Sequence, residues 1–141
     1  MEQSRTLQKE EIEIIEYLAG IAQYPLSLNW YNDYTATPMD DGGMGSILLT
    51  PAKPLLNPRK FKERISDCII EDTDGMSIIV SLNIDQDDYL FELDVWKCDF
   101  SPVIGKLDIN KKKTGDVWGQ FFDSSEQGML TWGQSPCEQN A

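Results

Sequence analysis

The chain of 141 residues contains no histidine. Histidine is the most frequent general base, a common metal ligand and the side chain that changes charge near neutral pH. Cysteine is scarce as well: there are three, without a CxxC spacing, and Cys68 and Cys98 fall inside predicted strands, where a thiol packs as a small apolar group. We therefore expect three reduced, structural cysteines, no metal site, no cofactor and no enzymatic activity.

Long hydrophobic runs are also missing. A helix that spans a membrane needs about 20 consecutive apolar residues, and no segment of the sequence approaches that length. The first residues, MEQSRTLQKEEIEIIEYL, have neither the basic start nor the unbroken apolar stretch of a secretory signal. The sequence therefore predicts a cytoplasmic protein that does not bind membranes.

Basic residues are few. Twelve lysines and arginines stand against 24 acidic residues, so the formal net charge is −12. A nucleic acid or an anionic membrane surface would repel such a domain, whereas a cationic protein would be attracted to it. With 40% hydrophobic residues, a chain of this length can bury a substantial core. Because a lysine run followed by glycine marks a boundary, we expect one domain over residues 1–110 and a C-terminal extension over residues 111–141.

The clearest feature that the chain does contain is a β-hairpin. From residue 74 to residue 100, DGMSIIVSLNIDQDDYLFELDVWKCDF, two runs alternate apolar and polar residues around an acidic connector at residues 85–88. A slip of one residue would bury Glu92 and Asp94 together, which is costly for unpaired charges. The predicted apolar pairs are Ile84 with Tyr89, Leu82 with Phe91, Val80 with Leu93, and Ile78 with Val95.

Other segments surround this hairpin. Residues 6–22 carry their apolar side chains on one helical stripe, with Thr6 as the predicted N-cap. Short strands are predicted at residues 27–31, 47–50 and 65–71, and residues 117–122 have a helix-like spacing that glycine interrupts. The sequence therefore predicts an α+β fold, in which an N-terminal helix packs on an antiparallel sheet of four or more strands with the hairpin at its centre.

Two acidic segments resemble ligand-binding loops but lack the required residues. In the hairpin connector, the sixth and twelfth positions of a calcium loop fall on Leu90 and Trp96, where glycine and glutamate are needed. The string DDGGMG at residues 40–45 lacks the GxGxxG spacing and the Walker lysine, and its carboxylates would repel a phosphate. We interpret it as a tight turn whose residues can adopt positive φ.

The polar face of the hairpin carries the candidate site. Glu92 and Asp94 are two residues apart on one strand, so they point to the same side, about 7 Å apart. That arrangement suits acid/base catalysis, and it also suits a solvated sheet face. Trp96 lies on the same face, where it either packs under the C-terminal extension or forms a hot spot for a partner.

Several strings in the chain resemble a family of small bacterial domains with no established activity. These strings are RTL at residues 5–7, DDGGMGS at 40–46, DG at 74–75, SLNID at 81–85 and FELDVWKCDFSP at 91–102. Their shared pattern is an N-terminal helix, a glycine-rich turn and a closing strand. The resemblance covers about residues 5 to 104, and it implies fold boundaries rather than a function.

In size, charge and lack of catalytic groups, the chain is also similar to the immunity proteins of contact-dependent and polymorphic toxin systems. Such proteins neutralise a basic toxic domain, often a nuclease, by binding it. This likeness implies that the partner is a cognate basic toxin domain. The acidic hairpin and its tryptophan are then the expected contact surface, which comprises Asp85, Asp87, Asp88, Glu92, Asp94 and Trp96.

Two alternatives remain open. The chain could be a regulatory or adaptor module that binds another basic protein without catalysis. It could also be an acid/base hydrolase that uses Glu92 and Asp94, and this alternative predicts a concave pocket around both carboxylates.

Overall fold

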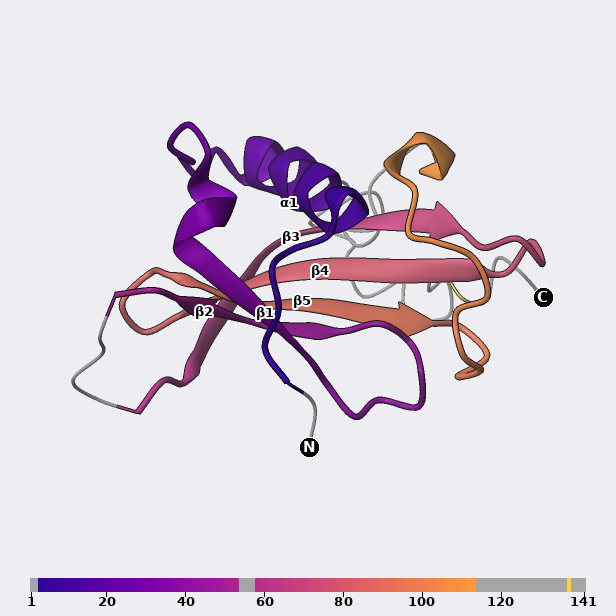
Figure 1. Cartoon of the computed structure of the whole chain (residues 1–141). Coiled ribbons are helices and arrows are strands. Elements are labelled where there is room, and N and C mark those ends of the chain that lie inside the picture. Colours follow the sequence, from indigo (N-terminus) through magenta and orange to yellow (C-terminus); the bar gives the residue numbers. More distant parts are fainter. Residues whose placement is uncertain (1–2, 54–57, 114–136, 138–141) are drawn as a thin grey trace, which may run out of the picture.

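The computed structural model describes residues 3–53, 58–113 and 137 (Figure 1). In this part of the chain, one α-helix, α1 (Lys9–Ala22), lies across a five-stranded antiparallel sheet of order β1-β2-β5-β4-β3. The predicted α+β fold, with an N-terminal helix on an antiparallel sheet, is confirmed. The strands are β1 (Tyr34–Pro38), β2 (Ile47–Pro51), β3 (Phe61–Glu71), β4 (Ser77–Asp85) and β5 (Leu90–Lys97).

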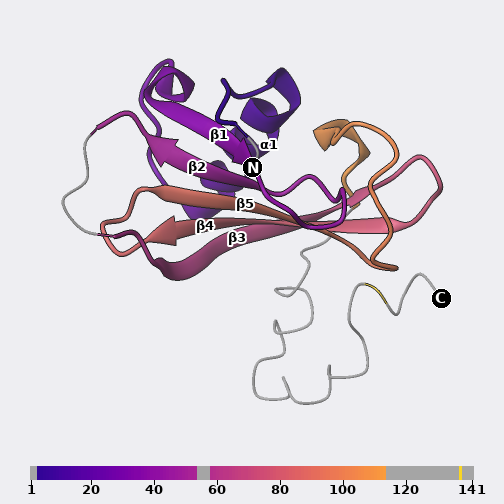
Figure 2. The ribbon, with the colours of Figure 1, turned by 60° about the horizontal axis from the view of Figure 1, so that its bottom comes forward.

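The main core lies between α1 and one face of the sheet. Ile14, Ile15 and Leu18 of the helix are completely buried and belong to one cluster with Val80 and Leu82 of β4. Figure 2 shows the sheet from another side, with α1 on one face of β3, β4 and β5. We call the opposite face of these strands the outer face. No helix in the described ranges is both long and apolar enough to cross a membrane.

The helix begins two residues later than predicted, because its N-cap is two residues after the predicted N-cap, Thr6. Its observed N-cap is Gln8, whose backbone N–H donates to the Glu11 carboxylate at 2.8 Å. The same carboxylate receives two hydrogen bonds of 2.8 Å from Arg5, so the residues before the helix are held in an extended path. The side-chain pairing of Arg5 with Glu11, which the helical stripe does not reveal, therefore sets the start of α1.

The hairpin register differs from the prediction by two residues. Leu82 faces Leu93 and Val80 faces Val95, because the loop is shorter than predicted and a β-bulge follows it in β5. In the loop, Asp88 adopts a left-handed φ of 69° and the Asp85 N–H donates to the Tyr89 carbonyl at 2.9 Å. Because the total shift is even, the face of each side chain beyond the bulge is as predicted.

The predicted strand at residues 27–31 is wrong. Asn29 has a left-handed φ of 59°, and a short 3-10 helix, η1 (Trp30–Asp33), follows it and leads into β1, which was not predicted. Trp30 is buried, and its indole N–H donates to Glu16 of α1 at 3.0 Å. This contact to the helix favours the turn over a strand. The predicted strands at residues 47–50 and 65–71 are confirmed as parts of β2 and β3.

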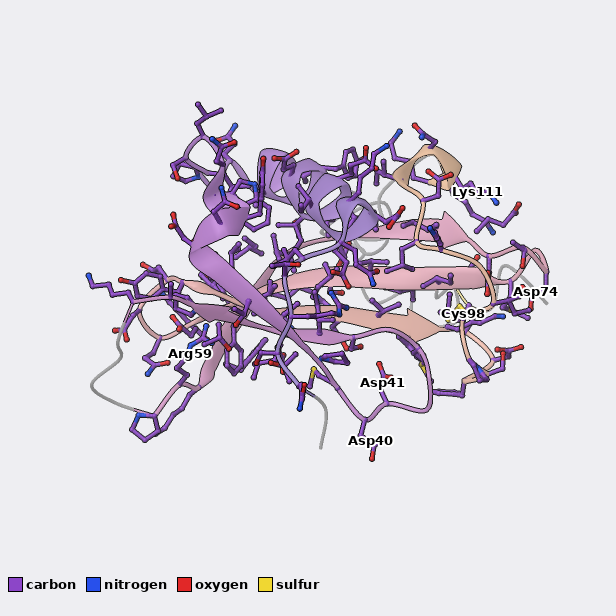
Figure 3. The ribbon with its side chains drawn as sticks, viewed as in Figure 1. Asp40, Asp41, Arg59, Asp74, Cys98 and Lys111 are labelled. Carbon is purple, nitrogen blue, oxygen red and sulfur yellow. A yellow bond between two sulfur atoms is a disulfide. The ribbon has the colours of Figure 1, made fainter. Side chains whose placement is uncertain are left out.

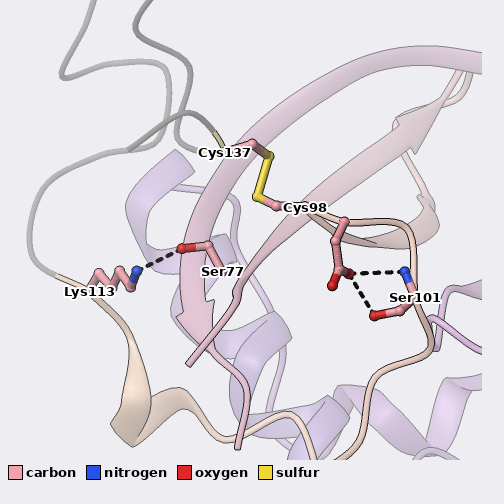
Figure 4. Close-up of a disulfide and its surroundings, with 6 residues drawn as sticks. Ser77, Cys98, Ser101, Lys113 and Cys137 are labelled. Carbon is pink, nitrogen blue, oxygen red and sulfur yellow. Dashed lines mark hydrogen bonds between the residues drawn. A yellow bond between two sulfur atoms is a disulfide. The ribbon is translucent and has the colours of Figure 1, made fainter. Parts of the chain in front are cut away.

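The prediction of three reduced cysteines is also wrong. Cys98, directly after β5, forms a disulfide with Cys137 (Figure 4). Cys68 is a buried free thiol, and burial raises its pKa to about 12. The pairing joins residues 39 positions apart, a proximity that spacing rules for cysteines do not reveal. Most of the predicted C-terminal extension, including the spacing at residues 117–122, lies outside the described residues.

Candidate functional site

The outer face is arranged in rows that run across β3, β4 and β5. The strand register places Asp67, Ser81 and Asp94 in one row. A neighbouring row holds Ile69, Ile79 and Trp96, and the row on the other side holds Arg64, Asn83 and Glu92. The outer face thus has an apolar part near the end of β5 and a polar part nearer the hairpin loop.

Three of the predicted site residues lie together on this face, because they alternate along β5. Asp94 is exposed, whereas Glu92 and Trp96 are half-buried. Asn83 donates to the Glu92 carboxylate at 3.1 Å, and the Ser46 hydroxyl lies 3.3 Å from Asp94. Neither carboxylate makes an ion pair with any residue that the structure describes.

Asp87 and Asp88 lie at the hairpin tip and are both exposed. Asp88 pairs with Lys62 of β3 at 2.7 Å, and the side chains of this pair are 64% and 46% exposed. Such a solvated pair contributes little to stability. The tip therefore remains available for contact with a partner.

Asp85 was predicted as a contact residue, and the structure contradicts this. It is completely buried, and it pairs with Arg59 at 2.8 Å (Arg59 is labelled in Figure 3). It also accepts the backbone N–H groups of Asp87 and Tyr89. Arg59 further donates to carbonyls of β2 and β5. Asp85 is a structural residue that holds the hairpin loop, because the turn brings two N–H groups to its carboxylate.

Trp96 forms a small apolar cluster on the outer face. It packs with Ile69, Ile79 and Cys137, and its ring lies 5.6 Å from that of Phe100. Its indole N–H is buried and has no hydrogen-bond partner among the described residues. The two alternatives for Trp96 were a ring packed under the C-terminal extension and a hot spot for a partner. The structure shows a ring that is partly covered, because the disulfide holds Cys137 against it.

A buried ion cluster lies at the other end of the hairpin, and the sequence reasoning missed it. Lys97 is completely buried and contacts Asp72 at 2.8 Å and Asp74 at 2.7 Å. Asp72 also accepts the backbone N–H groups of Ile104 and Gly105, so the segment after β5 is tied to the turn between β3 and β4. The alternation in β5 could have predicted the burial of Lys97, because Lys97 follows Leu93 and Val95 at the inward positions.

This cluster shifts the pKa values of its acids. Burial of Asp72 favours the neutral acid, but hydrogen bonds from the Ile104 N–H and from Lys97 outweigh it and lower the pKa well below the usual range. The hydrogen bond from Lys97 also lowers the pKa of Asp74. The hydrogen bonds that Lys97 donates, first to Asp72 and then to Asp74, raise the pKa of Lys97. The cluster therefore keeps its charges at neutral pH.

We expect Asp72 to make the free energy of unfolding depend on pH in the acidic range. Its pKa is about 3.9 in the unfolded chain and lower in the fold, so it contributes stability above about pH 5, and this contribution disappears as the pH falls through the folded pKa. Urea unfolding of the wild type and of Asp72→Asn measures the effect. The gap between the two midpoints should be widest at pH 7 and should narrow toward pH 2. A gap that does not change with pH would contradict this role for Asp72.

The DDGGMGS segment forms a tight turn with positive φ values, as predicted. Asp41 accepts the N–H groups of Met44 at 3.0 Å and Ser46 at 2.8 Å, while Gly42 and Gly43 have φ values of 76° and 84°. Burial would raise the pKa of Asp41, but these hydrogen bonds lower it. Asp41 also lines a cavity of about 450 Å³ between this turn, the start of α1 and residues 103–107. The hydrogen bonds to Asp41 hold together the turn that connects β1 with β2.

The polar part of the outer face contains an open groove of about 570 Å³. The first residues of β3, 61–64, form one side, Ser81 and Asn83 of β4 lie beneath, and Asp94 closes the other side. Glu92 does not line it, so the two carboxylates of the hydrolase alternative do not face one cavity. Among the described residues, no group of three or more histidine, cysteine or acidic side chains could hold a metal ion.

Comparison with known proteins gives one result. A family model described as a domain of unknown function (DUF6984) matches residues 4–107, from the segment before α1 to the segment after β5. No curated protein and no solved structure matches the chain.

Proposed function

The chain belongs to the DUF6984 family, and because this membership brings no known activity with it, we propose from the surface chemistry that the domain binds a basic protein. More specifically, we propose that it is a cytoplasmic immunity protein that neutralises a cognate toxin domain by forming a stoichiometric complex. The contact surface comprises Asp87 and Asp88 at the hairpin tip together with Glu92, Asp94 and Trp96 on the outer face.

One observation supports this proposal most strongly. Glu92 and Asp94 share an open sheet face, and neither has a cationic partner in the described part of the chain. The buried acids Asp72, Asp85 and Glu11 are each paired with a lysine or an arginine. The fold thus pairs its internal carboxylates and leaves Glu92 and Asp94 on the outer face available to arginines and lysines of a partner.

The charge of the domain favours the same partner class. A net charge of −12 speeds association with a basic domain. Ion pairs between the two proteins that are desolvated around an aromatic side chain slow dissociation. Trp96 is half-buried beside these carboxylates and offers such an aromatic surface. Fast association and slow release are what an inhibitor of a lethal enzyme needs.

The charge reversal Glu92→Lys with Asp94→Lys tests the surface. The partner to test is the C-terminal domain of any large protein encoded immediately upstream, and we expect the wild type to rescue growth and to co-purify with it one to one. The double variant should bind about 100-fold more weakly or worse, because two attractive contacts become repulsive. Isothermal titration calorimetry gives the affinities, and urea unfolding checks that the variant folds.

A matched control separates this surface from general charge. Glu13→Lys with Asp33→Lys makes the same change in net charge at exposed positions on α1 and η1, away from the outer face. It should retain most of the affinity. Equal loss in both double variants would reject the outer face as the contact surface. Normal folding without rescue or co-purification would favour the adaptor alternative, for which a pull-down identifies the basic partner.

A further inference from the structure

The groove on the outer face owes its shape to irregularities in β3. The register between β3 and β4 shifts between Phe61 and Glu63 and again between Arg64 and Ser66. Two shifts so close together bend the strand, because each bulge adds local twist. Figure 2 shows β3, the edge strand, bending away from β4 near its start. A flat sheet face thus becomes a groove with Asn83 at its base.

Asn83 is a polar residue whose side-chain oxygen accepts no hydrogen bond from the described residues. The residue is 6% exposed, and its side-chain oxygen has no hydrogen-bond partner in the described part of the structure. Its orientation is determined, because its Nδ2 donates to Glu92 at 3.1 Å and a flipped amide would place two oxygens together. A buried acceptor without a donor is destabilising and needs an explanation. A ligand that donates a hydrogen bond provides one.

The charges around the groove indicate what kind of donor fits. The cations on its rim already have partners, since Lys62 pairs with Asp88 and Arg64 with Asp67. The carboxylates differ: Glu63 and Asp94 line the groove, and neither has an ion pair among the described residues. The groove therefore combines an acceptor without a donor at its base with the Asp94 carboxylate, which has no ion pair among the described residues, at its side, while Glu63 interacts electrostatically with Lys62.

We propose that this groove binds the guanidinium group of an arginine from the partner. A guanidinium has five N–H donors in a rigid plane, so it can pair with the Asp94 carboxylate and also donate to the Asn83 oxygen. Phe61, which is 55% exposed on the same groove, offers a ring on which the guanidinium can stack. A lysine ammonium can also bridge two acceptors, but it lacks the planar fork that pairs with a carboxylate in two bonds and stacks flat on a ring.

This inference rests on the proposed function and deepens it, since it identifies the side chain that the basic partner inserts. Lys62 and Arg64, which flank the groove, are long side chains that are 46% and 47% exposed. Access to Asn83 therefore needs changes of rotamer and leaves the backbone as it is.

Arginine selectivity can be measured with short probes before the partner is known. The probes are the blocked tripeptide Gly-Arg-Gly and its lysine and citrulline analogues, titrated into the full chain and followed by NMR of the Asn83 side-chain amide. We expect the arginine peptide to bind about fivefold more tightly than the lysine peptide, the equivalent of one hydrogen bond. The citrulline peptide, which lacks the positive charge, should bind most weakly.

Asn83→Leu tests the base of the groove. It removes the unmet acceptor while keeping a similar shape, so it should abolish the preference for arginine and raise the melting temperature by about 3 °C. Asp94→Asn should weaken binding of both basic peptides. Asp33→Asn, the same change on an exposed residue of η1, should leave both affinities unchanged.

The possible results separate this inference from the proposed function. Equal affinity of the wild type for arginine and lysine peptides, or an arginine preference that persists in Asn83→Leu, would overturn the arginine groove. If Asp94→Asn still weakened binding more than Asp33→Asn, the outer face would remain a surface for basic proteins. Absence of binding by any peptide would also overturn the groove, whereas co-purification tests the immunity role independently.

Discussion

Asp85→Ala should lower the free energy of unfolding by about 3–5 kcal/mol, because it removes one member of a buried ion pair. Arg59, whose side chain is 11% exposed, would keep its charge without the carboxylate. The N–H groups of Asp87 and Tyr89 would lose their acceptor at the same time. This effect is large compared with the total stability of an ordinary domain. Urea unfolding followed by tryptophan fluorescence measures it.

Asp87→Ala is the matched control, two residues away on the same loop. Its side chain is exposed, and the substitution should change stability by less than about 0.5 kcal/mol. For binding, the order reverses, since Asp87 belongs to the proposed contact surface and Asp85 does not. A folded and stable Asp85→Ala protein with impaired binding would contradict the structural role assigned to Asp85.

Removal of the disulfide is the second change with a large expected effect. Cys137→Ser should lower the free energy of unfolding by about 4 kcal/mol, because a cross-link between residues 39 positions apart restricts the unfolded chain strongly. It should also free the apolar cluster of Trp96, Ile69 and Ile79 from its contact with Cys137. The change in stability is measured by urea unfolding with and without dithiothreitol.

The reductant provides the control. It should destabilise the wild type to the level of Cys137→Ser and should leave the variant unchanged, since the remaining thiols do not form this bond. Unfolding curves of the wild type that coincide with and without reductant would contradict the disulfide. Disulfides are uncommon in a reducing cytoplasm, so alkylation of fresh cell extracts followed by mass spectrometry also tests the proposed localisation.

Alternation along a strand decides which side of a sheet a residue faces, and this much was predictable. Glu92 and Asp94 lie on the outer face, although the register is two residues from the prediction. An even shift preserves the faces, whereas the exact partners depend on the loop and the bulge near Phe91. The geometry of the hairpin loop depends on which carboxylate accepts its backbone N–H groups. The sequence places aspartates at positions 85, 87 and 88 and does not show which of them is the acceptor.

The candidate site shows the same limit. Asp85 and Asp87 are alike in the sequence, yet one carboxylate holds the loop from within and the other lies in solvent. Lys97 continues the inward alternation of β5, but only the approach of Asp72 from another turn makes its burial possible. The groove above Asn83 depends on two shifts in the register between β3 and β4, and no local pattern of residues predicts them.

By itself, the sequence determined the fold class, the helix on its apolar stripe, the two faces of the hairpin and the excess of negative charge. These properties depend on periodicity and composition, which are local or additive along the chain. The tertiary structure decided which acids are paired, that Cys98 meets Cys137, and that Asn83 lies without a donor beneath an open groove. Those outcomes depend on contacts between residues far apart in the chain, and such contacts exist only after the strands have bent and packed.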